Sequence, residues 1–181
     1  GRVRITYCAE EERGGLRLLL RALRRLPDEL DWEGVIWFDG PGDPLARVSR
    51  RLRRRLRVVR PRDGEPAEYL AGADVACLTS GGVRAAPGVL RKAFSAGAVP
   101  VVSDLELYRE LVGEGDRGLL FPLGDAQTLA AQLQRLCADA ALRDRLRAAA
   151  RESGEARAWR EVTDEVEAVY RRLAARRHDP D

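Results

Sequence analysis

Residues Ala85–Asp104 read AAPGVLRKAFSAGAVPVVSD, a stretch with the start and stop signals of a helix followed by a strand. A Pro-Gly pair opens it, an apolar run follows, and Gly97 closes that run. The VPVV that comes next is continuously apolar, as expected of a strand in a sheet that helices cover on both faces. The stretch therefore predicts a helix and a buried strand, with one cation just before it (Arg84) and one inside the helix (Lys92).

The same alternation continues along the chain, because short β-rich runs are separated by amphipathic stretches with helical spacing. One helical face carries Leu16, Leu19, Leu20 and Leu23. A strand–helix repetition predicts an α/β fold, a Rossmann-like doubly wound parallel sheet. A second apolar face is predicted for a helix through Leu45, Val48, Leu52 and Leu56. The expected strands are Val3–Cys8, Val35–Phe38, Leu56–Arg60, Val75–Thr79, Val99–Ser103 and Gly118–Phe121.

The strand signals stop at Gly124, so residues 1–124 are expected to form the sheet core and residues 125–181 extra C-terminal helices of the same domain. Three helices are expected there: from a cap at Asp125 to about Ala138, from near Leu142 to Glu152, and from about Ala156 to Ala175.

Composition narrows the class of protein. The 32 Lys and Arg nearly balance 29 Asp and Glu, so a nucleic-acid partner is not expected. Cys8, Cys77 and Cys137 lack metal-ligand spacing and predict reduced core residues of a cytoplasmic protein. The chain has no methionine, even at position 1, which favours a fragment of something longer. Oligomeric state is left open.

Two helix starts are candidate anion sites, because ligands of open α/β sheets sit outside the carboxyl ends of the strands. The first is CAEEERGGLRLLL, where Arg13 precedes Gly14 and a second glycine; the alternative is a plain turn with a solvated arginine. It is not a G-x-G-x-x-G fingerprint, so no dinucleotide cofactor is expected. At the second, the backbone N–H groups of Gly88, Val89 and Leu90 are expected to be free for a diphosphate; the alternative is a helix that only packs.

Nine arginines between Arg47 and Arg62, here called the arginine run, are expected to coat the solvated face of one helix. The alternative is peripheral contact with an anionic membrane or with nucleic acid. The one histidine, His178, lies in the tail, so no catalytic triad, catalytic residue or metal site is assigned.

Five segments together resemble the C-terminal domain of retaining GT-B glycosyltransferases, the group of bacterial hexosyltransferases and glycogen synthases. They are ERGGLRLLLRALRRLP, VIWFDGPGDP, YLAGADVACLTS, AFSAGAVPVVSD and GDRGLLFPLGDAQTLAAQL, in the order and at the spacing of that family. The resemblance implies a single GT-B C-terminal domain that binds a nucleotide-sugar and works with an N-terminal acceptor domain absent from this chain.

By that resemblance, a hexosyl group is transferred from a UDP-, GDP- or ADP-sugar, with no further cofactor, to an unidentified acceptor. Arg13 would take the position of the family's diphosphate-binding lysine, and Arg84 and Lys92 would take those of two glutamates that hold the sugar and the ribose. The isolated chain is expected to be inactive, because the site would lie between two domains. A degenerate scaffold or partner-binding domain and a sugar-nucleotide epimerase remain as alternatives.

Overall fold

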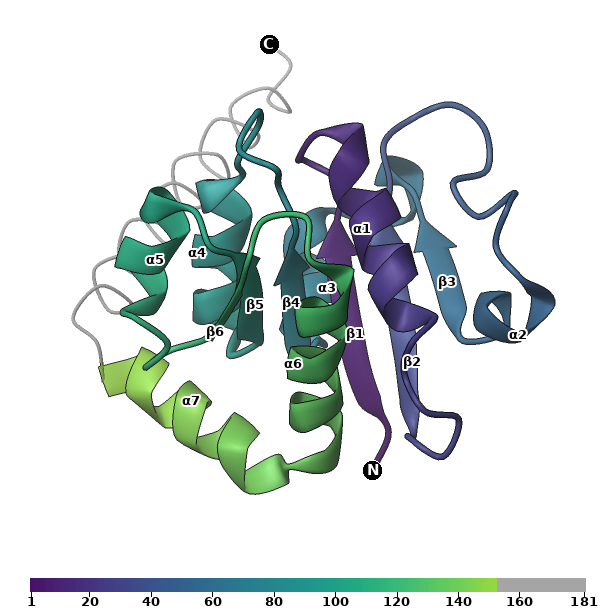
Figure 1. Ribbon diagram of the computed structural model, residues 1–181. Helices are drawn as coiled ribbons and strands as arrows, with labels where there is room; N and C mark the ends of the chain where they lie inside the picture. Colours follow the sequence, from purple (N-terminus) through teal and green to yellow (C-terminus); the bar gives the residue numbers. More distant parts are fainter. Residues whose placement is uncertain (153–181) are drawn as a thin grey trace, which may run out of the picture.

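Six parallel strands form one sheet in the order β3-β2-β1-β4-β5-β6 in the computed structural model, which describes residues 1–152 (Figure 1). From β1 the chain winds outward to β3, and from β4 it winds outward to β6 on the other side. The direction of winding therefore reverses between β1 and β4, as in doubly wound α/β folds. The predicted fold class is confirmed.

The elements follow one another in the predicted alternation. The strands are β1 (Val3–Cys8), β2 (Trp32–Trp37), β3 (Leu56–Val59), β4 (Val75–Leu78), β5 (Val99–Ser103) and β6 (Leu119–Phe121). The helices are α1 (Arg13–Leu23), α2 (Arg50–Arg53), α3 (Pro66–Ala71), α4 (Pro87–Ala96), α5 (Glu106–Val112), α6 (Ala126–Ala138) and α7 (Ala140–Glu152), with a short 3-10 turn at Pro61–Asp63. The helix predicted at about Ala156–Ala175, and His178, lie outside the described residues.

The stretch Ala85–Asp104 forms α4 and β5, as predicted. Pro87 occupies the first helical position, where its missing N–H has no intrahelical partner to lose. Gly97 ends the helix with φ at +77°, a left-handed conformation that glycine adopts without strain. All five residues of β5 are buried. The local signals here agree with the tertiary packing.

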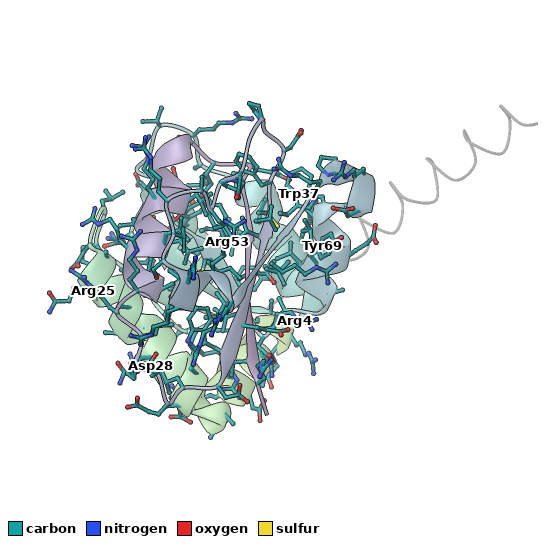
Figure 2. All side chains as sticks on the ribbon, turned by 90° about the vertical axis from the view of Figure 1, so that its right-hand side faces the viewer. Arg4, Arg25, Asp28, Trp37, Arg53 and Tyr69 are labelled. Atoms are coloured by element: carbon teal, nitrogen blue, oxygen red, sulfur yellow. The ribbon has the colours of Figure 1, made fainter. Side chains whose placement is uncertain are left out.

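Helices cover both faces of the sheet. On one face, Tyr7 and Val101 pack with residues of α1 and α6, such as Leu19 and Leu133. On the other face, α3, α4 and α5 pack over the alternate residues of the strands. Figure 2 looks onto the β3 edge and shows Arg4, Trp37 and Tyr69 on the side away from α1. Within residues 1–152, no helix has the length and apolar composition needed to cross a bilayer.

The predicted helix through Leu45, Val48, Leu52 and Leu56 is wrong. Only Arg50–Arg53 is helical, and Leu56 begins β3, where it pairs with Gly34 of β2. A Cβ on Gly34 would lie 2.5 Å from the Leu56 Cδ2 atom, so the glycine leaves the space that this leucine fills. Pairing between strands thus overrides the helical spacing of the leucines.

The arginine run is also not the solvated face of one helix. Arg60 donates hydrogen bonds to the carbonyl oxygens of Gly40 and Gly42, in the loop after β2. Arg55 donates to two carbonyl oxygens in the turn before β2, both at 2.7 Å, and its guanidinium lies 5.2 Å from the centre of the Trp32 ring. These arginines hold the connections on either side of β2.

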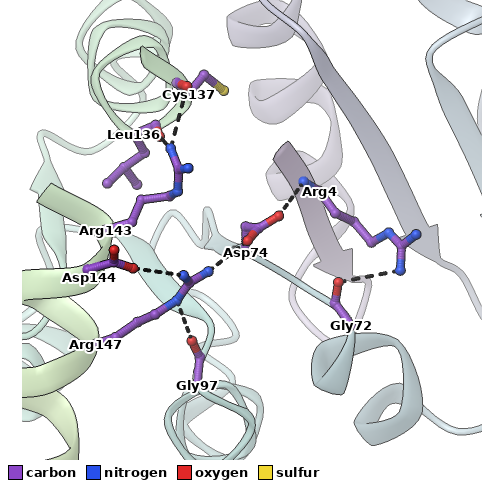
Figure 3. Close-up of polar contacts among 9 residues, drawn as sticks. All are labelled: Arg4, Gly72, Asp74, Gly97, Leu136, Cys137, Arg143, Asp144 and Arg147. Carbon is purple, nitrogen blue, oxygen red and sulfur yellow. Dashed lines mark hydrogen bonds and ion pairs between the residues drawn. The ribbon is translucent and has the colours of Figure 1, made fainter. Parts of the chain in front are cut away.

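Helix α7 is tied to the amino ends of the central strands by Arg147 (Figure 3). Its guanidinium donates to the carbonyl oxygen of Gly97 at 3.0 Å and to the carboxylate of Asp74 at 2.7 Å. The second Asp74 oxygen accepts the N–H of Arg4 at 2.9 Å, which extends the link to β1. Burial opposes ionisation of Asp74, but these hydrogen bonds outweigh it and hold the pKa of the carboxyl below its usual value.

We expect the Arg147→Ala variant to lose about 1–3 kcal/mol of unfolding free energy, because the partly buried Asp74 carboxylate loses its charged partner. Arg145→Ala on the same helix is the matched control, since this side chain is exposed, and its change should stay within about 0.5 kcal/mol. Urea unfolding followed by circular dichroism measures both. Equal losses in the two variants would contradict the anchoring role.

Candidate functional site

Three loops meet at the carboxyl edge of the sheet, beside the place where the winding reverses (Figure 1). They are the β1–α1 loop (residues 9–12), the β2–α2 loop (residues 38–49) and the β4–α4 loop (residues 79–86). Helices α1 and α4 begin at the same edge, so their N-terminal N–H groups point toward it. This is where doubly wound sheets bind their ligands.

A cavity of about 400 Å³ lies between these loops. Phe38, Arg17 and Arg84 line it together with the carboxylates of Glu11 and Glu12. A larger hollow of about 620 Å³ opens at the opposite edge of β1, β2 and β3, away from the starts of α1 and α4. The cavity of about 400 Å³ lies at the carboxyl edge beside the start of α1 and is therefore taken as the candidate site.

The buried carboxylate of Glu11 joins the β1–α1 loop to the β4–α4 loop. One oxygen accepts the backbone N–H of Thr79 at 2.7 Å. The other accepts the N–H of Ser80 at 3.0 Å and the hydroxyl of Tyr108, on α5, at 2.8 Å. The Tyr108 hydroxyl in turn accepts the N–H of Ala86, just before α4, at 2.7 Å. One side chain thus positions both ends of the β4–α4 loop.

Burial raises the pKa of Glu11 to about 7, although its three hydrogen-bond donors act in the opposite direction. The side chain is 7% exposed, so water does little to stabilise its ionised form. Burial thus favours the protonated form of Glu11 more than water does for an exposed carboxyl.

The carboxylate of Glu12 accepts several hydrogen bonds from the β4–α4 loop. It accepts the Ser80 hydroxyl at 2.8 Å, the Arg84 N–H at 3.2 Å and the Gly81 N–H. Burial opposes ionisation of Glu12, but these hydrogen bonds outweigh it and lower its pKa. The chain's own carboxylate thus occupies backbone donors that would otherwise be available to a bound anion.

The two glycines at the start of α1 have different surroundings. A Cβ on Gly15 would lie 2.8 Å from the Tyr7 hydroxyl and 3.0 Å from the Thr79 Oγ1 atom. A Cβ on Gly14 would meet only the Glu12 side chain, at 4.0 Å. Gly15 is thus required where α1 packs against β1 and the β4–α4 loop, whereas Gly14 is exposed and leaves the helix start open.

Only part of the predicted diphosphate site is available. Arg13 and Gly14 are the first two residues of α1, and Gly88 is exposed with no neighbouring atom within 4 Å of a Cβ. The prediction of free N–H groups at Val89 and Leu90 is wrong, because both donate to the Ala86 carbonyl oxygen, at 3.1 and 3.4 Å. Ala86 is the N-cap, so the Leu90 bond is the first i to i−4 bond of α4, and both side chains are buried.

Arg84 and Lys92, the two predicted cation positions, are both exposed but differ in location. Arg84 lines the cavity. Lys92 lies on α4 near Cys8; burial raises the pKa of that thiol to about 12, and the lysine charge opposes the rise. The site thus brings Arg84, but not Lys92, into the lining of the cavity.

Sequence reasoning missed Glu11, Glu12 and Tyr108. A run of three glutamates directly before Gly-Gly was the available signal for the first two, since carboxylates at a strand end can accept hydrogen bonds from a neighbouring loop. Tyr108 is 97 residues from Glu11, and no local pattern connects them.

Residues 2–139 match the family described as Glycosyl transferases group 1. Because the match covers most of the chain, the protein belongs to this family. The chain is 33% identical over 163 residues to the phosphatidyl-myo-inositol mannosyltransferase of Mycolicibacterium smegmatis, covering 89% of this chain and 42% of that protein.

Solved structures of GT-B glycosyltransferases share the fold. Sucrose-phosphate synthase from Thermosynechococcus elongatus superposes with a TM-score of 0.67 at 24% identity, over 96% of this chain and 46% of that one. Anabaena HepE in complex with UDP gives 0.68 at 16% identity, over 92% of this chain and 49% of that one. The chain therefore spans about half the length of the proteins it matches, and the resemblance to GT-B proteins is confirmed for family and fold.

The two glycines make a matched pair of variants. We expect Gly15→Ala to destabilise the fold by about 1–3 kcal/mol, because its methyl group has no room beside Tyr7 and Thr79. Gly14→Ala should be neutral or stabilising by up to about 1 kcal/mol, since alanine favours a helix. Thermal unfolding of both variants checks the difference, and equal effects would contradict the packing role.

The raised pKa of Glu11 predicts a pH-dependent stability. An unperturbed carboxyl ionises near pH 4.5 and Glu11 in the fold near 7, so the folded state holds the extra proton between these values. Its contribution to stability is present below pH 4.5 and falls as the pH rises to about 7, by at most about 3 kcal/mol.

The measurement is the difference in unfolding free energy between the unmodified chain and Glu11→Gln, which cannot titrate, from pH 4 to 8. We expect that difference to fall with rising pH. A difference that rises with pH would show that the hydrogen-bond donors outweigh burial.

Proposed function

We propose that the chain is the donor-binding half of a glycosyltransferase. Its cavity would hold a UDP-, GDP- or ADP-sugar, and a hexosyl group would pass to an acceptor bound by an N-terminal domain of a longer chain. The main support is a cavity of about 400 Å³ at the carboxyl edge of the sheet, in a chain that belongs to the Glycosyl transferases group 1 family. Arg84 is part of the lining of this cavity. No cofactor beyond the sugar nucleotide is invoked.

The diphosphate would bind at the starts of α1 and α4. Gly14 and Gly88 lack a Cβ and are exposed, so phosphate oxygens can approach the backbone there, where the helix dipoles favour negative charge. Arg84 would add a cation from the β4–α4 loop. Arg13 would also bind the diphosphate. Lys92 would bind a phosphate, although the family resemblance places a ribose contact at this position.

The relatives support this ligand class and reaction. HepE is described in complex with UDP, and the Mycolicibacterium relative is a mannosyltransferase. Because the chain spans 42% of that relative, transfer would require the remainder of a longer protein.

A second candidate is a non-catalytic domain that serves as a scaffold or partner-binding module. Two observations favour it. Arg84 and Lys92 stand where the GT-B resemblance expects glutamates, and Lys and Arg can only donate hydrogen bonds, whereas sugar and ribose hydroxyls need acceptors as well. Glu12 also occupies donors of the β4–α4 loop. Binding of a sugar nucleotide separates the two candidates.

The test is thermal unfolding of the 181-residue chain with UDP-, GDP- and ADP-sugars at millimolar concentration. A ligand at 100 times its dissociation constant should stabilise the fold by about 2.7 kcal/mol. Gly88→Glu should weaken binding at least about 10-fold, because a carboxylate at this open helix start repels the diphosphate. Ala148→Glu, exposed on α7, is the matched control and should bind normally.

The same assay on the double variant Arg84→Glu with Lys92→Glu compares the two candidates directly. In a donor site that holds the diphosphate as proposed, this change should weaken binding of the sugar nucleotide, because it replaces two phosphate-binding cations by carboxylates. Flat unfolding profiles of the unmodified chain with every sugar nucleotide would reject the donor-binding proposal in favour of the scaffold.

A further inference from the structure

A hollow of about 420 Å³ runs along the outer side of α1, between this helix and residues 43–48 of the β2–α2 loop. Four arginines line it: Arg17, Arg21 and Arg24 from α1, and Arg47 from the loop. Positions 17, 21 and 24 are four and three residues apart, so they share one face of the helix. We call this hollow the arginine groove.

The positive charge of the groove is not neutralised within the described residues. Arg17, Arg21 and Arg47 are exposed and have no carboxylate partner between residues 1 and 152. Asp43, the one acidic residue that lines the groove, is held at 2.8 Å by Arg53, which Figure 2 labels. Hydrogen bonds from Arg53 and the Leu45 N–H lower the pKa of Asp43. The negative charge of Asp43 is therefore already paired with Arg53, which does not line the groove.

The floor of the groove is apolar. Leu20 is buried, Pro44 and Val48 are half-buried, and Ala46 is exposed at the edge. Arg17 and Pro44 also line the candidate site, so the groove is continuous with it. An apolar floor with cations on both sides matches a ligand that presents apolar and anionic groups together.

We propose that the arginine groove is the surface by which this protein docks on an anionic lipid bilayer. Of the arginine run, only Arg47 lines the groove, whereas Arg55 and Arg60 are bound to neighbouring backbone. The exposed arginines lie on both sides of the apolar floor, so that anionic headgroups can pair with them while acyl chains contact the floor. Docking there would set the candidate site beside the membrane, and it does not depend on the proposed function.

The test is sedimentation of the 181-residue chain with vesicles of phosphatidylcholine, with and without phosphatidylglycerol. We expect binding only to the anionic vesicles. The triple variant Arg17→Gln, Arg21→Gln, Arg47→Gln should bind on the order of 100-fold more weakly, from about 1 kcal/mol for each arginine near an anionic surface. The matched control removes the same charge elsewhere, at three exposed arginines: Arg57→Gln, Arg62→Gln and Arg145→Gln.

Ala46→Leu and Ala46→Gln test the apolar floor at an exposed position without changing the charge. We expect the leucine variant to bind anionic vesicles several-fold more tightly than the glutamine variant, because its side chain can enter the apolar region of the bilayer. Equal binding of the two would contradict a role for the floor.

Two results would overturn the proposal: no binding to anionic vesicles, or equal losses of binding in the two triple variants. A third would be release of the bound chain by soluble polyglutamate that binds the same arginines as tightly as the vesicles do. The last would identify an acidic protein partner instead of a membrane.

Discussion

The buried carboxylate of Glu11 is the contact on which the geometry of the candidate site depends. It accepts two backbone N–H groups at the start of the β4–α4 loop and, through Tyr108, is linked to the N–H of Ala86 at its end. The loop carries Arg84 into the cavity and leads into α4. Removing the carboxylate would leave the buried N–H groups of Thr79 and Ser80 without an acceptor, which is costly in free energy. The loop would then lose its contacts with Glu11 at both ends.

The shape of the site favours an anionic ligand, whereas one of its own carboxylates already occupies part of its hydrogen-bond donors. Its position, its helix starts and its family favour a nucleotide diphosphate, whereas Glu12 already fills donors of the β4–α4 loop. An incoming phosphate would therefore bind beside Glu12, at the open starts near Gly14 and Gly88, or displace its carboxylate at the cost of those hydrogen bonds. Arg84 is placed to offset the repulsion between the two anions.

Sequence periodicity predicted the sheet well, because strands covered on both faces give continuous apolar runs and Gly97 ends α4 in a left-handed conformation. It failed for the helix expected through Leu45, Val48 and Leu52, because only Arg50–Arg53 is helical. The strand expected from Leu56 is present and pairs with β2 over Gly34. The expectation of free N–H groups failed at Leu90 because the N-cap, Ala86, lies four residues before it, and at Val89 because the first turn closes with an i to i−3 bond. The Glu11–Tyr108 contact joins residues far apart in sequence, which no local pattern reveals.

The most direct test of a diphosphate site at the carboxyl edge is an amide NMR titration of the 181-residue chain with UDP, GDP and ADP. We expect at least one of them to shift the signals of Gly14, Gly81 and Gly88 most, because these amides lie at the two helix starts and in the β4–α4 loop. Largest shifts at Gly34 and Arg57, in the hollow at the opposite edge, or no shifts with any of the three, would contradict it.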